Sequence, residues 1–71
     1  MNDHGPDEEK AIVARIAVLR QEHADLDASI YALERQPLPD QLLIMRLKRK
    51  KLSLRDQIVL LEDDLTPDII A

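Results

Sequence analysis

The 71-residue sequence contains no cysteine, no tryptophan and no phenylalanine, and Tyr31 is its single tyrosine. Without cysteine the chain can form neither a disulfide framework nor a thiolate metal site. One aromatic ring is too few for a base-stacking surface, and the core lacks bulky aromatic anchors. A domain this small buries a thin core, and oligomerisation is a usual remedy when disulfides and metals are missing.

Long hydrophobic runs and positive net charge are missing as well. No apolar run approaches the ~18 residues that a membrane-spanning helix needs. The first nine residues are acidic and lack the apolar segment of a signal peptide. The net charge of −4 argues against a dedicated binder of nucleic acid or of anionic membranes. We therefore expect a cytoplasmic protein that makes no contact with membranes, a location that also suits a chain without cysteine.

Two stretches of the chain carry apolar residues at alternating steps of three and four, which is the spacing of a coiled-coil seam. The first seam consists of Ile12, Ile16, Leu19, His23, Leu26, Ile30 and Leu33. The second consists of Ile44, Leu47, Lys51, Leu54, Ile58, Leu61 and Leu65. Proline tolerates the first position of a helix and ends a preceding one. The spacing and the prolines predict one domain, residues 1–71, with helices over about 6–35 and 40–65, a turn at 36–39 and a tail at 66–71.

Two helices of similar length joined by a short turn form an antiparallel hairpin, so we predict an all-α, two-helix coiled coil. Pro39 suits the first position of the second helix, with Asp40 in its first turn. Centring the turn between Leu38 and Pro39 sets the register of the seams. The flanking charges agree with this register, which opposes four pairs, namely Glu34 to Lys48, Asp27 to Arg55, Arg20 to Glu62 and Arg15 to Asp64.

A second apolar row repeats every seven residues on each helix, outside the seam. We call these six residues the association stripe: Ala17, Ala24, Tyr31, Met45, Leu52 and Val59. In the predicted register the two rows lie on the same edge of the hairpin and face each other. A lone hairpin leaves them in water, so they are either a broad face of a monomer or a surface for self-association into a helical bundle. We favour self-association.

Two segments of the sequence resemble a known family. Residues 19–27, with Ile30 following, are similar to the first half of the small bacterial YdcH-like proteins, and residues 46–58 are similar to their second half. The ending, residues 67–71, is similar to the tails of some members. Arg55 and Gln57 stand where the family would have Lys and Glu, and both keep the helical pattern. The resemblance implies a short cytosolic helical hairpin and supplies no catalytic residue.

The seams contain two polar residues, His23 and Lys51, and both admit a structural reading. His23 lies near Glu22, Asp25 and Asp27, but no second histidine stands at the helical spacing of a metal site. No serine or cysteine occurs in the frame of a catalytic nucleophile. A single polar residue in a seam can set the register of a coiled coil. We therefore expect no catalytic, metal or cofactor site, and we interpret both residues as determinants of specificity.

The basic residues of the second helix offer an alternative function. Lys48, Lys51 and Arg55 are used by the predicted hairpin, which leaves Arg46, Arg49 and Lys50 as possible contacts to RNA or DNA. A solvated helix face is the simpler interpretation of these three residues. The tail containing Ile69 and Ile70 could dock on the hairpin, enter a partner's groove, be read by a protease or be frayed. Taken together, the sequence predicts a non-enzymatic protein that associates with itself and with a partner helix of unknown identity, the alternative being a weak nucleic-acid-binding module.

Overall fold

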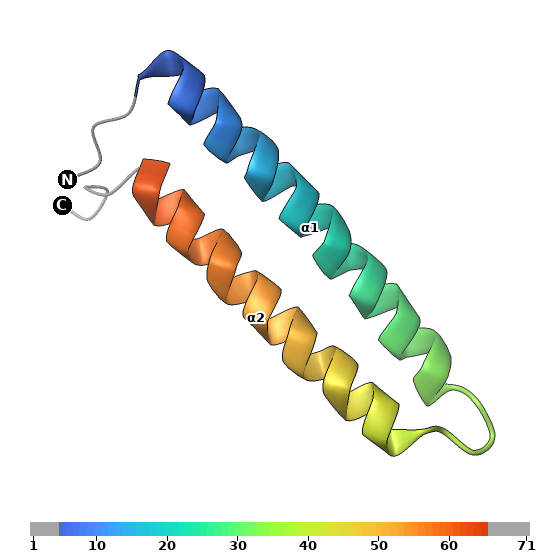
Figure 1. Ribbon diagram of the computed structural model, residues 1–71. Coiled ribbons are helices and arrows are strands. Elements are labelled where there is room, and N and C mark those ends of the chain that lie inside the picture. Colours follow the sequence, from blue (N-terminus) through green and yellow to red (C-terminus); the bar gives the residue numbers. More distant parts are fainter. Residues whose placement is uncertain (1–4, 66–71) are drawn as a thin grey trace, which may run out of the picture.

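A computed structural model describes residues 5–65, which form two α-helices and no strand. Helix α1 spans Pro6–Glu34 and helix α2 spans Gln41–Leu65. The helices run antiparallel and side by side, so the start of α1 and the end of α2 lie at one end, the open end, and the turn lies at the other (Figure 1). The molecule measures 50 × 24 × 16 Å. The predicted all-α hairpin is confirmed.

Helix α1 begins where its sequence satisfies the free backbone groups of a helix start. Pro6 occupies the first position, where its missing N–H needs no partner. Gly5 precedes it, and its backbone N–H donates a hydrogen bond of 3.0 Å to Glu8 Oε1. Asp7, Glu8 and Glu9 place negative charge at the positive end of the helix dipole. The helix ends at Glu34, three residues before Pro37.

Helix α2 begins one residue later than the sequence analysis places it. The Asp40 carboxylate accepts a 3.0 Å hydrogen bond from the Leu43 backbone N–H, and the Asp40 carbonyl accepts one from Ile44 at 3.0 Å. Asp40 is therefore the N-cap of α2 and not part of its first turn. Pro39 precedes the cap. Aspartate is among the strongest N-cap residues because its short side chain reaches the backbone N–H two or three residues ahead.

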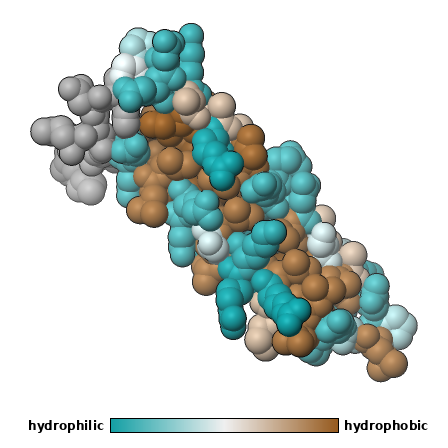
Figure 2. Space-filling model, viewed as in Figure 1, coloured by the Kyte–Doolittle hydropathy of each residue, from teal (hydrophilic) through white to brown (hydrophobic). Residues whose placement is uncertain are grey.

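The core is the single seam between the helices. Five residues are buried, namely Ile16, Leu19, Ile30, Ile44 and Leu54, and all five are seam residues. The other nine seam residues are half-buried. Two helices cannot enclose a seam on both sides. On the face shown in Figure 2, hydrophobic residues remain visible along the hairpin between hydrophilic side chains.

Candidate interaction surface

The association stripe is exposed along both helices. The exposed fractions are 63% for Tyr31, 55% for Met45, 53% for Leu52 and 46% for Val59. Ala17 and Ala24 are exposed as well. These residues repeat at seven-residue intervals, so each row follows one side of its helix from the open end towards the turn. The hairpin itself leaves this apolar surface uncovered.

Ion pairs connect the two helices along the edge that carries the association stripe. Arg20 pairs with Glu62, and Lys48 Nζ lies 3.0 Å from Glu34 Oε2, as the predicted register requires. The third pair differs from the prediction. Asp27 Oδ1 accepts a hydrogen bond of 2.7 Å from Lys51 Nζ, so its described partner is Lys51 and the predicted pair with Arg55 is wrong. Lysine has a long, flexible side chain, which lets a seam residue extend its charge to the edge of the helix.

The edge between the rows is hollowed over the half of the hairpin nearer the open end. One hollow is lined by Val13, Ile16, Ala17, Arg20, Glu62 and Leu65. The next is lined by Arg20, His23, Arg55, Ile58, Val59 and Glu62. Both hollows contain Arg20 and Glu62, so they are continuous. This ion pair therefore lies between Ala17 of one row and Val59 of the other, and the two rows share one edge.

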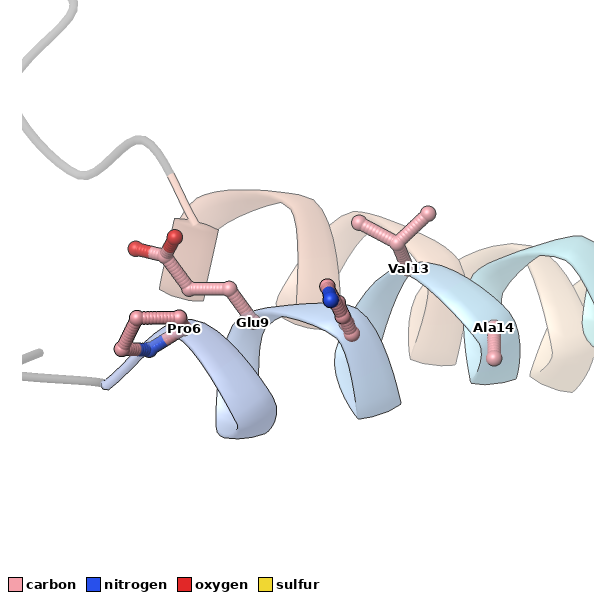
Figure 3. Close-up of a pocket in the computed structure, with 5 residues that line it drawn as sticks. Pro6, Glu9, Val13 and Ala14 are labelled. Carbon is pink, nitrogen blue, oxygen red and sulfur yellow. The ribbon is translucent and has the colours of Figure 1, made fainter.

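Two further hollows adjoin this groove, one at the open end and one beside it on α2. The first of these hollows lies on the first turns of α1 and is lined by Pro6, Glu9, Lys10, Val13 and Ala14. Figure 3 shows Val13 and Glu9 on the same side of α1, with α2 behind. The other lies beside Val59 and Leu60 on α2. Val13 lines two of these hollows and is not among the residues predicted from the sequence. The heptad spacing could have identified it. Val13 lies seven residues before Arg20 and four before Ala17, which places it on the same edge of α1.

Tyr31 contacts a residue of its own helix. Arg35 Nη1 donates a hydrogen bond of 3.1 Å to Tyr31 Oη, and the Arg35 guanidinium carbon lies 5.1 Å from the ring centroid. This is a cation–π distance. Residues four apart meet on a helix surface, so the pair is a local consequence of their spacing. It holds the ring at the turn end of the association stripe.

The two polar seam residues lie in different surroundings. Lys51 is half-buried at its base and sends its ammonium group to Asp27. His23 is half-buried and lines the groove beside Arg20 and Arg55. No hydrogen bond between His23 and another described residue is present.

The Asp27–Lys51 pair has a measurable electrostatic signature. The hydrogen bond from Lys51, and then its charge, hold the pKa of the Asp27 carboxyl below its ordinary value of 3.8. A carboxyl with a lowered folded-state pKa stabilises the fold above its unfolded pKa, and this contribution is lost as the pH falls through the folded pKa. The pair therefore weakens in acid and is fully present at neutral pH.

We expect the substitution Lys51→Met to raise the pKa of Asp27 towards 3.8, because it removes the two largest causes of the lowering. An NMR pH titration of the side-chain carboxyl carbon measures this shift. Lys48→Met is the matched control, since Lys48 pairs with Glu34 and its removal should leave Asp27 unchanged. An Asp27 titration that is the same in Lys51→Met and in the parent contradicts the assignment.

The basic residues proposed for nucleic-acid contact lie on α2. Arg46, Arg49 and Lys50 are exposed, and none forms an ion pair with a described residue. Within residues 5–65 no three potential metal ligands lie together, and neither described helix is apolar enough over a sufficient length to cross a membrane. The tail at 66–71, for which the sequence left several roles open, lies outside the described residues.

Comparison with known families agrees with this architecture. The sequence model of a family described as "Protein of unknown function (DUF465)" matches residues 16–62. The chain belongs to this family. YdcH-like small helical proteins are DUF465 members, so the resemblance of residues 19–27 and 46–58 to them is confirmed. The DUF465 match contains the whole association stripe, both polar seam residues and Arg46, Arg49 and Lys50. No curated protein and no solved structure matches the chain.

Proposed function

We propose that this DUF465 protein is a non-enzymatic, cytoplasmic helical hairpin that acts by associating with itself, and with partner helices, through the association stripe. The observation that carries the proposal is the uncovered apolar row on each helix, both rows sharing one edge. Contiguous exposed apolar surface with polar residues at its rim is typical of protein interaction sites. Amphipathic helices bind such grooves through residues at helical spacing.

The thin core supports the same proposal. A two-helix chain buries only five residues within the described range, whereas large exposed apolar side chains are more numerous. Association would bury this exposed apolar surface, and each Å² buried stabilises the complex by roughly 25 cal/mol. The ion pairs between the rows oppose association, since covering them removes water from charged groups. We therefore expect reversible association in the micromolar range and not a permanent assembly.

The test is sedimentation equilibrium at tens of micromolar, where the parent chain should have the mass of a dimer or larger. Leu52→Glu and Val59→Glu should each weaken association at least tenfold, because each places a charge within the association stripe. Val18→Glu is the matched control. Val18 is 49% exposed, against 46% for Val59, and it lines none of the hollows of the groove. A monomeric parent, or equal loss in Val18→Glu, contradicts the proposal.

The charge pattern of α2 favours a second candidate function, weak binding of nucleic acid. From Gln41 to Arg55 the helix has six cationic residues and no carboxylate. Salt separates the two candidates. Three phosphate contacts would give a slope of roughly −2 to −3 in log K against log salt, whereas apolar association does not weaken in this way. The probe is a labelled 20-nucleotide oligonucleotide, single- or double-stranded, titrated with the parent chain and with Arg46→Ala/Arg49→Ala/Lys50→Ala.

A further inference from the structure

Charge is unequally distributed along the hairpin. The first turn of α1 contains Asp7, Glu8 and Glu9, and the last turn of α2 contains Glu62, Asp63 and Asp64. Both turns lie at the open end, where the start of α1 extends beyond the end of α2 (Figure 1). The cationic stretch from Gln41 to Arg55 begins at the turn end. The open end therefore carries an acidic cluster from both helices, and the part of α2 nearer the turn is basic.

The same gradient follows the outer border of the association stripe. On α1, Asp7 and Arg35 are four heptads apart and occupy equivalent positions, beyond the row of Ala17, Ala24 and Tyr31. On α2, Arg49 and Asp63 are two heptads apart, beyond the row of Met45, Leu52 and Val59. Both helices thus border the association stripe with an acidic residue near the open end and a basic residue nearer the turn.

We propose that the partner of the association stripe is a second copy of this chain in antiparallel orientation, with the turn end of one hairpin beside the open end of the other. This inference rests on the self-association proposed above and specifies its geometry. Charge complementarity selects the orientation, because an antiparallel copy sets the acidic last turn of each α2 against the basic stretch of the other α2 and sets Asp7 against Arg35. A parallel copy would set acidic end against acidic end, and like charges in contact disfavour a complex.

The position of the two-fold axis follows from the charged residues. The midpoint between Asp7 and Arg35 is Gln21, and the midpoint between Arg49 and Asp63 is Asp56. These midpoints lie at about the same height on the hairpin, because their neighbours Arg20 and Arg55 line one hollow. A single two-fold axis through this level therefore pairs Asp7 with Arg35 of the second copy and Asp63 with Arg49 of the second copy.

The same axis determines which residues of the association stripe meet. With the axis at Gln21 and Asp56, α1 packs on α1 of the second copy, and α2 packs on α2. Ala17 then faces Ala24 of the second copy, and Leu52 faces Val59 of the second copy. Alanine pairs permit a short distance between helix axes, which suits the α1 contact. In a parallel dimer α1 would instead pack on α2, and Ala17 would face Val59 of the second copy.

Because the chain has no cysteine, introduced thiols report these contacts directly. We would prepare Ala17→Cys, Ala24→Cys and Val59→Cys, mix them in pairs at tens of micromolar, and equilibrate each mixture in a glutathione redox buffer. Non-reducing electrophoresis and mass spectrometry then measure the disulfide-linked dimers. The antiparallel arrangement should yield the 17–24 disulfide in at least fivefold excess over the 17–59 disulfide. All three sites are exposed, so the substitutions should leave the hairpin folded.

The outcomes separate this inference from the proposed function. A dominant 17–59 disulfide, or equal yields of both, overturns the antiparallel arrangement even though self-association stands in sedimentation. A monomer mass with no disulfide overturns both. A charge exchange gives a second measurement: Arg49→Glu alone should weaken association several-fold, and Arg49→Glu/Asp63→Lys should restore it. Failure of the double variant to recover contradicts the pairing of these residues across the axis.

Discussion

Replacing Leu19 with alanine should remove roughly half or more of the protein's free energy of unfolding and lower its melting temperature steeply. Leu19 is 1% exposed, the lowest value among the buried core residues. Removing a buried leucine side chain costs about 2–5 kcal/mol, because the transfer free energy is lost and a cavity remains. A domain of this size has a stability on the order of 5 kcal/mol. The substitution therefore removes a large share of the total free energy of unfolding.

Circular dichroism at 222 nm during thermal and urea denaturation measures this loss. The matched control is Leu60→Ala, which removes the same atoms from a side chain that is 68% exposed. Alanine has the higher helix propensity, so the control should match the parent or exceed it slightly. Equal stabilities for Leu19→Ala and Leu60→Ala would show that the seam between the helices is not the core of the protein in solution.

The sequence predicts the fold well because a two-helix hairpin depends on local information. The alternating steps of three and four identify the residues that face the other helix. In the structure all fourteen seam residues are buried or half-buried, while all six residues of the association stripe are exposed. The prolines fix the approximate ends of the helices, and the short turn leaves the antiparallel arrangement as the geometry available.

Two details of the fold depend on competition between close alternatives, and the sequence does not resolve them. Asp27 lies within reach of cations at two neighbouring levels, and register alone favours Arg55. The long side chain of Lys51 extends from the seam to Asp27, and its Nζ lies 2.7 Å from Asp27 Oδ1. At the start of α2, Pro39 and Asp40 are both suited to a helix terminus. The hydrogen bond from the Leu43 N–H to the Asp40 carboxylate decides between them.

The candidate surface is predictable only in part. Heptad spacing identifies the six residues of the association stripe, since it is a property of each helix alone. The groove between the rows depends on how side chains from both helices meet, and its extension to Val13 requires the structure. The partner that covers this surface depends on a second chain as well as on this one. For that reason the partner and its orientation are proposals that require measurements on the assembled protein.

Replacing both His23 and Lys51 with leucine should raise the melting temperature while making the association less specific. Both residues are half-buried in the seam, where a leucine would bury apolar surface. Each leucine adds on the order of 1–2 kcal/mol at such a site. For a domain of this size, 1 kcal/mol corresponds to about 4–8 °C in Tm. Loss of the Lys51–Asp27 pair acts in the opposite direction, but Asp27 is exposed and the effect is the smaller one.

The loss of specificity follows from the uniformity of the altered seam. In the parent, His23 and Lys51 distinguish the middle of the seam from its two apolar ends, which penalises registers that bury either residue among leucines and isoleucines. The double variant has apolar residues at all fourteen positions, so shifted registers and larger helical bundles become accessible. Light scattering should show a larger average mass, and NMR spectra should show broadened or multiple peaks.

The two halves of this prediction fail separately. A double variant that melts below the parent shows that His23 and Lys51 stabilise the fold, and the proposed exchange of stability for specificity is then wrong. A variant that melts higher with unchanged mass and one set of sharp NMR peaks shows that specificity resides elsewhere, in the ion pairs Arg20–Glu62 and Lys48–Glu34 and in the turn. The single variants His23→Leu and Lys51→Leu assign the effect, because only Lys51→Leu removes the hydrogen bond to Asp27.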